Sequence, residues 1–583
     1  MRVPLFFILL FFSSSAFAQS PSKRQPDRVI LEGISQAGNY APLNESYYQL
    51  IDRYEVKSGQ LSTYIFTTIK PYKRSDIAAF LDSANSLGLF TSASDKFNLE
   101  YLQNDNWEWT RPETNESRKP VFKYFYKKKS DLLNVDDDPD FDLHVNPVLY
   151  AGAGKDSESD DLMFINTRGV EVRGMLDKKI GFYMYLTENQ LRVPSYVART
   201  ITNNAAVGYY PVIPHEGFWK AFKDNQGYDF FQARGYISFG ATKHFNIQFG
   251  HDRFFIGNGQ RSLIFSDHAP PALFLKGNIK VWKLNYLFMV NRMVADVNGD
   301  ASGLRSSGKY PDKYVALHHL SVNIGKKLNI GVFESVVFNS TDSTSFEWSY
   351  LNPVIFYRAI EQQFGSSDNV ILGADFKWNA FKGVSIYGQF VLDEFVLDNL
   401  KDGNGWWANK FGIQTGIKYY DAFGVSNLDL QAEANIVRPY TYSHNTPYGS
   451  YSNYLQPIAH PLGANFKELI GVVRYQPIPR LNLIGKLIMM QVGRDTTDVN
   501  WGGDILKDNS SREKDFDNAT TQGVKNDILL ATFTASWQFK HNLFMDASVV
   551  IRKSESPLSF YNNNTSITSV TLRWNIPQRL YEF

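Results

Sequence analysis

The feature that most constrains this fold is an alternation of apolar residues with small or polar residues, which begins near residue 141 and continues towards the C-terminus. Two examples are FNIQFG at residues 245–250 and LFMDASVV at residues 543–550. A period of two residues predicts β-strands with two chemically different faces. The predicted strands run for about 10–14 residues, which is long for a soluble sheet and sufficient to cross a membrane at a tilt.

The connections between these predicted strands alternate in length. Eight are short, near residues 177–179, 242–243, 282–283, 325–327, 381–383, 421–423, 477–479 and 540–541. Nine are longer, roughly 154–163, 190–227, 255–272, 294–313, 339–370, 397–408, 438–465, 494–526 and 554–565. A bacterial barrel with both termini in the periplasm has one more long loop than it has tight turns. The pattern therefore predicts 18 strands, and a large soluble sandwich or propeller would not sort its connections in this way.

The N-terminus reads MRVPLFFILLFFSSSAFAQS, with one arginine, a short apolar core and small residues at Ala16 and Ala18. This pattern predicts a secretory signal peptide of residues 1–18, cut before Gln19. The apolar run is too short to span a hydrocarbon core of about 30 Å as a helix. At the other end, the last predicted strand, about 567–576, leads to Leu580–Phe583, and a terminal aromatic residue after an alternating strand resembles the recognition end of outer-membrane barrels.

Between these regions, residues of about 30–130 have a mixed pattern. Residues 74–89 show helical spacing of apolar side chains, with Ser75 or Asp76 as the predicted N-cap and Gly88 as the stop. The basic run 127–129 and the acidic run 136–140 are expected to be solvated linker. The aspartates of 136–142 are an alternative cation site, although they lack the spacing and the glycine of a calcium loop.

These observations predict three segments: a signal peptide (1–18), a periplasmic N-terminal helical or mixed domain with a linker (19–140), and an outer-membrane β-barrel (141–583). The fold class is all-β transmembrane, an antiparallel barrel of about 18 strands with a small α-containing domain. We expect the cell outer membrane as its location and outer-membrane lipid as its surroundings. Because 18 strands enclose a wide lumen, the N-terminal region and inward-folding loops are the candidates for filling it.

Composition excludes several functional classes. The chain has no cysteine, which excludes disulfides, thiolate metal sites and a cysteine nucleophile. Its 60 Lys and Arg residues against 59 Asp and Glu residues argue against nucleic acid as a partner, because such binding requires a basic excess. We expect no metal and no cofactor.

The long loops are rich in aromatic residues. Tyr448 and Tyr451 belong to a group of tyrosines in 438–465, and Trp406 and Trp407 lie on another loop. Rings that stack on sugar C–H faces, among polar groups that bind hydroxyls, suit glycan binding. An interfacial aromatic girdle with ordinary loop packing is the alternative interpretation, and the sequence leaves both open.

Two further loop segments combine polar and aromatic residues. Residues 250–271 carry glycines at 257 and 259, which permit a close backbone approach, and arginines that offer bidentate donors. Residues 348–364 carry Arg358 and Glu361 among aromatic residues. Both segments are candidates to fold into the lumen, and surface loops held by their own side chains are the alternative. The predicted polysaccharide-binding residues are Arg253, Asn258, Gln260, Arg261, Arg358, Glu361, Trp406, Trp407, Tyr448 and Tyr451.

A catalytic function is an alternative hypothesis, because one segment contains the atoms of a nucleophile and a base, in His251, Asp252, Ser262, Ser266, Asp267 and His268. No G-x-S-x-G and no H-E-x-x-H motif is present. With ten histidines and abundant serine, such neighbours arise by chance, and we predict that the protein is not an enzyme.

The segment GHDRFFIGNGQRSLIFSDHAPP at residues 250–271 resembles the G-R-Q-x-x-G-P-G-x-x-x-S-L-x-L-S-x-N-A-x-P stretch of the Wzi-type capsule assembly family. The residues in register after a one-residue deletion are Arg253, Gly257, Gly259, Ser262, Leu263, Ser266, Ala269 and Pro271. Asp252, Asn258 and His268 depart from the family pattern. Asn352-Pro353 with Arg358 is also similar, as is the order of signal peptide, helical domain and 18-strand barrel.

Residues 48–59 and 351–373 also resemble Bacteroidota outer-membrane proteins, including the gliding-motility protein RemB. The Wzi-type resemblance implies a surface-exposed barrel that holds capsular or related polysaccharide, and it does not imply an enzyme. Two alternatives remain: a passive porin, and an outer-membrane component of a gliding or secretion apparatus that binds periplasmic or surface proteins.

Overall fold

The structure is a computed structural model that describes residues 38–583 except 139, 207–211, 223–226, 296–309, 339–346, 355, 359–367 and 497. The predicted signal peptide, residues 1–18, lies outside the described residues. The described part forms one compact unit.

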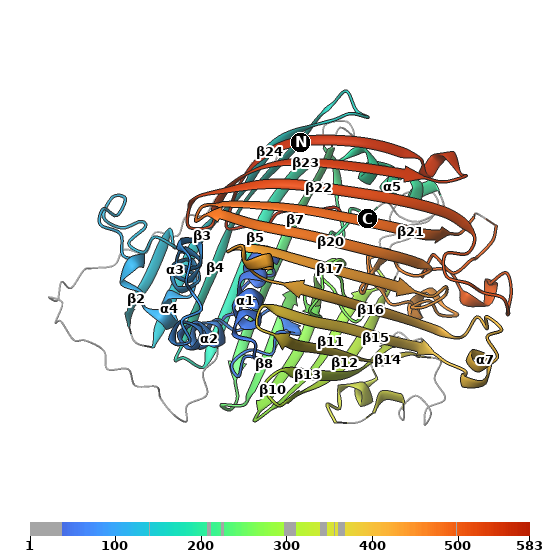
Figure 1. The fold of residues 1–583 in the computed structure, drawn as a ribbon, viewed down its shortest axis with the longest axis horizontal. Helices are drawn as coiled ribbons and strands as arrows, with labels where there is room; N and C mark the ends of the chain where they lie inside the picture. The colour runs from blue at the N-terminus through green and yellow to red at the C-terminus, as the bar shows by residue number, and fades with distance from the viewer. Residues whose placement is uncertain are drawn as a thin grey trace. The chain divides into compact units, whose positions relative to one another are not determined.

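A closed antiparallel barrel is the main element (Figure 1). Its last strand pairs with its first, from Ile567 opposite Asp156 to Trp574 opposite Leu149. The prediction of 18 strands is confirmed. The strands are β3 (Phe141–Asp156), β4 (Leu162–Leu176), β5 (Ile180–Arg192), β7 (Gly227–Gly240), β8 (Phe245–Asp252), β10 (Ala272–Val281), β11 (Leu284–Val294), β12 (Asp312–Ile324), β13 (Leu328–Phe338), β14 (Asn369–Phe381), β15 (Val384–Glu394), β16 (Lys410–Tyr419), β17 (Leu428–Val437), β20 (Phe466–Ile478), β21 (Leu481–Arg494), β22 (Val524–Lys540), β23 (Leu543–Glu555) and β24 (Asn563–Trp574).

The two faces of the barrel wall differ in the manner that a membrane requires. On β7, Phe231 and Ile237 are exposed on the outside, whereas Gln232 and Arg234 are buried on the lumen side. Apolar side chains face outward and polar ones inward, which is the reverse of a soluble protein. Within the described part of the chain, no helix combines the length and the apolarity that a membrane-spanning helix needs.

The barrel has a turn end and a loop end. All eight predicted short connections join neighbouring strands at the turn end, where β3 also begins and β24 also ends. Figure 1 shows helices α1 (Glu45–Ser58), α2 (Arg74–Ser86), α3 (Ala93–Asp105) and α4 (Trp107–Thr110) at that end, and helices α5 (Ser195–Ala206) and α7 (Leu397–Lys401) at the loop end. Short strands outside the 18 are β1 (Ile69–Lys70), β2 (Leu133–Asp138), β6 (Lys220–Phe222), β9 (Phe255–Ile256), β18 (Ser452–Asn453) and β19 (Gln456–Pro457).

Residues 38–132, which we call the plug, contain the helices α1–α4 packed on an aromatic core of their own. The predicted helix at 74–89 is present as α2, but its N-cap is Lys73, which has no side-chain cap bond, so the prediction of Ser75 or Asp76 as cap was wrong. Asp136–Asp138 of the acidic run predicted as linker instead belong to β2, which pairs with β3. Among the described residues, no cluster of acidic and histidine side chains is arranged to hold a metal ion.

Buried ion pairs dock helix α1 of the plug inside the turn end of the lumen. Lys377 on β14 donates to Asp52 at 2.5 Å and also to Glu55, and Lys418 on β16 donates to Asp52 at 2.5 Å. Arg53 pairs with Asp429 on β17. Burial alone would raise the pKa of Asp52, but the two ammonium groups lower it well below its usual range. Side chains of the barrel wall and the plug therefore neutralise one another.

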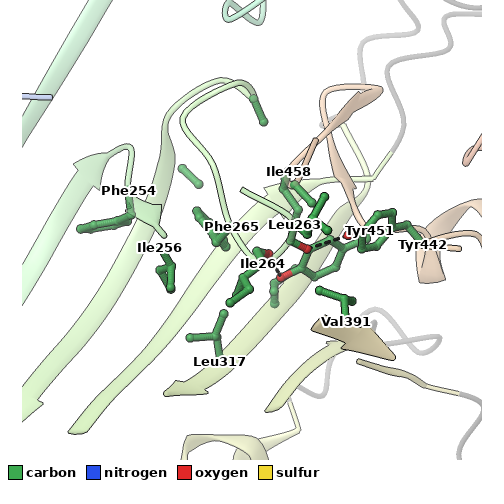
Figure 2. Close-up of a cluster of buried hydrophobic side chains, with 14 of the residues drawn as sticks. Phe254, Ile256, Leu263, Ile264, Phe265, Leu317, Val391, Tyr442, Tyr451 and Ile458 are labelled. Atoms are coloured by element: carbon green, nitrogen blue, oxygen red, sulfur yellow. Dashed lines mark hydrogen bonds between the residues drawn. The ribbon is translucent and has the colours of Figure 1, made fainter. Parts of the chain in front are cut away.

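Two long loops fold into the lumen from the other side. Residues 253–271, which we call the crossing loop, join β8 to β10. This loop also contacts strands across the barrel: Gln389 on β15 accepts a hydrogen bond from the Leu263 amide at 2.7 Å. The loop 438–465 packs on it, and the Tyr442 and Tyr451 hydroxyls donate to the carbonyls of Leu263 and Ile264 at 2.6 and 2.9 Å (Figure 2). The crossing loop thus forms the centre of an apolar cluster inside the barrel.

The crossing loop also pairs with the plug. Strand β9 of the loop and strand β1 of the plug form a two-stranded antiparallel sheet in which Ile256 lies opposite Ile69 and Phe255 opposite Lys70. Main-chain hydrogen bonds therefore link the segment that fills the turn end to the segment that crosses the lumen.

The C-terminus departs from the sequence prediction. Strand β24 ends at Trp574, and residues 575–583, which we call the tail, turn back into the lumen. The carbonyl of Phe583 accepts from Arg552 at 3.1 Å, and the Tyr196 hydroxyl of α5 donates to Tyr581 O at 2.6 Å. The sequence predicted a last strand that continues to about residue 576 and leads to Leu580–Phe583, whereas β24 ends at Trp574 and the tail then turns inward.

The docking of the plug predicts a stability effect for Lys377→Met. The substitution leaves Asp52 paired only with Lys418 and leaves Glu55 without its cation, and breaking a buried pair costs about 3–5 kcal/mol. We expect a lower thermal unfolding midpoint in detergent and faster tryptic release of the plug helices. The matched control is Lys525→Met, which removes an exposed partner of Asp527 and should cost no more than about 1 kcal/mol. Equal effects of both substitutions would contradict this account.

Candidate functional site

A lumen pocket of about 290 Å³ lies between the plug, the crossing loop and the tail. This volume is at the lower end of the range for ligand sites, about 300–1,000 Å³. Its lining holds seven Lys and Arg side chains, five Asp and Glu side chains, seven Asn and Gln amides and five Tyr and Phe rings. Such a mixture offers hydrogen bonds to hydroxyl groups, apolar ring faces and a small excess of positive charge.

Close approach of the crossing loop to the wall depends on two glycines. A Cβ atom at Gly259 would lie 2.3 Å from a carboxylate oxygen of Glu433, and one at Gly257, where φ is +156°, would lie 2.8 Å from the Gln389 amide nitrogen. Without side chains at these positions, the amides of Gln260 and Arg261 donate to the Glu433 carboxylate at 2.6 and 3.0 Å. The glycines predicted from the sequence to permit close approach therefore have that role.

Two cations of the pocket lack a carboxylate partner within ion-pair distance among the described residues. The Lys70 ammonium donates to Gly257 O at 2.6 Å and lies 4.8 Å from the centre of the Phe255 ring. The Arg253 guanidinium donates only weakly to Asp267 O, at 3.4 Å. Burial, and secondarily the neighbouring Lys418, lowers the pKa of Lys70 to about 7. An anionic group in the pocket would remove this cost.

The remaining cations of the crossing loop and the tail are already paired. Arg261 donates to Glu468 at 3.1 Å and to Glu582 O of the tail at 2.6 Å. The Glu582 carboxylate lies 2.7 Å from the Lys486 ammonium, and Arg579 lies 3.5 Å from Glu216. These contacts hold the tail in place, so that Arg261 acts as an internal support of the pocket wall.

The structure brings together four of the ten residues predicted from the sequence. Arg253, Asn258, Gln260 and Arg261 all line the pocket. Arg358 is exposed elsewhere, with its amide donating to Glu334 at 2.9 Å. Glu361 lies outside the described residues.

The predicted aromatic residues lie in the long loops, away from the pocket. Trp406 packs on Phe516, with ring centres 4.9 Å apart, and the Arg512 guanidinium covers Trp407 at 4.0 Å. Both tryptophans and Tyr448 are half-buried. The Tyr451 ring is only 1% exposed, which does not support the stacking on sugars predicted for it; the ring instead supports the crossing loop.

The serines considered as nucleophiles make structural hydrogen bonds. The Ser262 hydroxyl donates to Ile256 O at 2.5 Å, and the Ser266 hydroxyl donates to Ala459 O. Each proton is thus given to a backbone carbonyl within the folded loop, whereas a nucleophilic serine needs a base as its acceptor. This arrangement favours a binding site.

Sequence reasoning missed several pocket residues, namely Lys70, Arg234, Lys418, Gln431, Arg474 and the tail. The strand residues among them occupy the polar phase of the alternation, so a phase assignment for each strand would have found them. Lys70 and the tail carry no such signal, because they reach the pocket through long-range packing.

The family model described as capsule assembly protein Wzi matches residues 155–566, which is more than half of the chain. Among solved structures, the chain is similar to Wzi of Escherichia coli, described as an outer membrane protein involved in group 1 capsule assembly and as a carbohydrate-binding β-barrel. That match has 12% identity and a TM-score of 0.55, and it covers 93% of this chain and 100% of that chain. At this identity the likeness establishes a shared fold.

Two more distant barrels are OccK8 (OprE) of Pseudomonas aeruginosa and OccAB1 of Acinetobacter baumannii. The first has 8% identity and a TM-score of 0.39 over 75% of this chain and 97% of that chain. The second has 9% identity and a TM-score of 0.39 over 74% and 96%. Scores this low carry no argument about this chain. Among curated proteins, none matches this sequence.

The environment of Lys70 predicts a pH dependence of stability. Because its pKa is about 7 when folded and about 10.5 when unfolded, the unfolded chain binds more protons between these values. The free energy of unfolding should therefore rise with pH across this window, by at most about 1.4 kcal/mol per pH unit from this group. Lys70→Met should remove that part of the slope in reversible urea unfolding. Lys96→Met, at an exposed site on α3, is the control, and an unchanged slope in Lys70→Met would contradict the assignment.

Proposed function

The chain belongs to the capsule assembly protein Wzi family, and from this premise we propose that it is an outer-membrane β-barrel that binds or anchors capsular polysaccharide at the cell surface. The observation that carries the proposal is the lumen pocket, in which the Lys70 ammonium and the Arg253 guanidinium have no carboxylate within ion-pair distance in the part of the chain that the structure describes. The carbohydrate binding described for Wzi of Escherichia coli supports the same function.

We propose that the barrel spans the outer membrane with its turn end towards the periplasm. The apolar outer face of the wall supports the membrane location, and the plug at the turn end supports the orientation. In this arrangement residues 1–18 are the signal peptide, residues 19–140 are the N-terminal domain on the periplasmic side, and the long loops face the outside of the cell.

Within this function, Arg253, Asn258 and Gln260 are proposed to contact the saccharide directly. Gln260 also donates to Gln431 at 3.1 Å, and Asn258 donates to the Thr68 hydroxyl at 3.0 Å, so both amides are held in position. Arg358, Trp406, Trp407 and Tyr448 remain proposals for a second contact region on the loops. The proposed role is binding, with no catalytic step.

A passive porin is less consistent with the contacts inside the barrel. The plug, the crossing loop and the loop 438–465 are tied to the wall and to one another by buried hydrogen bonds. A gliding or secretion role, with periplasmic or surface proteins as partners, has no specific contact in its favour among the described residues.

The binding proposal predicts that Arg253→Ala weakens retention of polysaccharide extracted from the native host. Loss of a charge-assisted hydrogen bond costs about 1.5–3 kcal/mol, which corresponds to a tenfold or larger loss of affinity. The measurement is binding of the purified barrel to immobilised polysaccharide. The control is Arg168→Ala on the outer wall, which removes an exposed arginine paired with Glu188.

Deletion of the gene tests the same proposal in cells. We expect a loss of cell-attached capsule with more polysaccharide in the medium, and complementation by the Arg168→Ala variant but only weakly by Arg253→Ala. If the capsule is unchanged in the deletion strain, and the purified barrel conducts ions freely in planar bilayers, the porin hypothesis replaces this proposal.

A further inference from the structure

A short hairpin of the plug, residues 116–129, exposes an unusual number of large apolar side chains. Val121, Phe122, Tyr124 and Phe125 are 48%, 81%, 68% and 38% exposed. In water, four neighbouring apolar residues with this exposure are costly, and such a group marks a surface that contacts a partner or a membrane. The proposed saccharide function uses none of them.

The hairpin has a defined shape. Its strands are closed by antiparallel bridges between Glu116 and Lys128 and between Val121 and Phe125. Its base is held by the Asn115 amide, which donates to the Ser130 hydroxyl at 2.9 Å. The aromatic tip therefore projects on a structured stem, and residues 127–129, which the sequence predicted as solvated linker, belong to that stem.

The hairpin contacts the turn end of the barrel wall through Tyr126. The Tyr126 ring stacks on Trp574, the last residue of β24, with the planes at 7° and the centres 6.1 Å apart. Trp574 is in phase with Val570 and Leu572, which are exposed on the outer face of β24, whereas Arg573 points into the lumen. Tyr126, next to Phe125 in the sequence, thus joins the hairpin to the apolar outer surface at its turn end.

The hairpin is strongly basic, with Glu116 at its base as its one acidic residue. Between residues 117 and 129 there are six basic residues and no acidic residue, namely Arg118, Lys119, Lys123, Lys127, Lys128 and Lys129. All except Lys128 are exposed, and Lys128 pairs with Glu116. Membrane interfaces favour aromatic side chains, which enter the outer part of the acyl region, and clusters of Lys and Arg, which bind anionic headgroups. The hairpin combines both kinds of residue.

We propose that residues 116–129 form a lipid anchor that inserts Phe122, Tyr124 and Phe125 into the periplasmic leaflet and binds the phosphate groups of anionic phospholipids through its lysines and arginine. The proposal rests on the membrane location of the barrel and is independent of saccharide binding. Phospholipid is favoured as the occupant because Tyr126 joins the hairpin to the lipid-facing strand β24 and because the basic charge of the hairpin complements anionic headgroups.

The absence of cysteine from the chain permits a site-specific test. Phe122→Cys, labelled with the fluorophore NBD, is placed in full-length barrel reconstituted in vesicles of phosphatidylethanolamine and phosphatidylglycerol. We expect blue-shifted emission and at least threefold stronger quenching by lipids that carry a nitroxide near the headgroup than at the control site. The control is Asn85→Cys, an exposed residue of α2. Equal quenching at both sites would overturn the proposal.

The role of charge is tested in the same labelled protein. Replacing Lys119, Lys123 and Lys127 by glutamine should reduce the quenching, and so should vesicles of phosphatidylcholine alone. The shift between boiled and unboiled samples on gels reports that the barrel remains folded. If neither change alters the quenching, the proposed contact with phosphate groups is wrong. If the label is shielded from quenching only at high protein-to-lipid ratio, the surface instead contacts a second copy of the chain.

Discussion

The rest of the structure depends on the need to satisfy polar groups on both sides of the barrel wall. In an apolar medium, backbone amides and carbonyls must pair within the sheet, which forces the strands to close. Closing 18 strands leaves a wide lumen lined by polar side chains. Here that lumen is filled by other parts of the chain, and Lys377 and Lys418 show how the filling is stabilised, since each donates to a carboxylate of helix α1.

Filling the lumen with chain also creates the candidate site. The plug, the crossing loop and the tail are far apart in the sequence, and they meet around one pocket. The β1–β9 pairing joins the first two, and Arg261 joins the crossing loop to the tail through Glu582 O. A ligand in this pocket therefore contacts segments from both ends of the chain, so that binding and the packing of the lumen are energetically coupled.

The sequence predicted those parts of the fold that depend on short-range periodicity. Strand number and all eight tight turns follow from alternation and connection length. The crossing loop was identified by its glycines and arginines, and Gly259 indeed permits the contact with Glu433. Features set by long-range packing were not predictable: the burial of Tyr451 depends on the crossing loop beneath it, and the inward course of the tail depends on partners such as Arg552 in the lumen.

The arrangement of charge in the pocket indicates which chemical group of a ligand would complement it. The Glu582 carboxylate already pairs with Lys486, and Arg261 is shared between Glu468 and the tail, so the chain itself neutralises this side of the pocket. Among the described residues, the Lys70 ammonium and the Arg253 guanidinium are hydrogen-bonded to carbonyl oxygens, and neither has a carboxylate within ion-pair distance. A protonated Lys70 is costly there, and a carboxylate of an acidic sugar would offset that cost, whereas a neutral sugar would leave it unchanged. Under the proposed function, this pairing favours a polysaccharide that carries carboxylate groups.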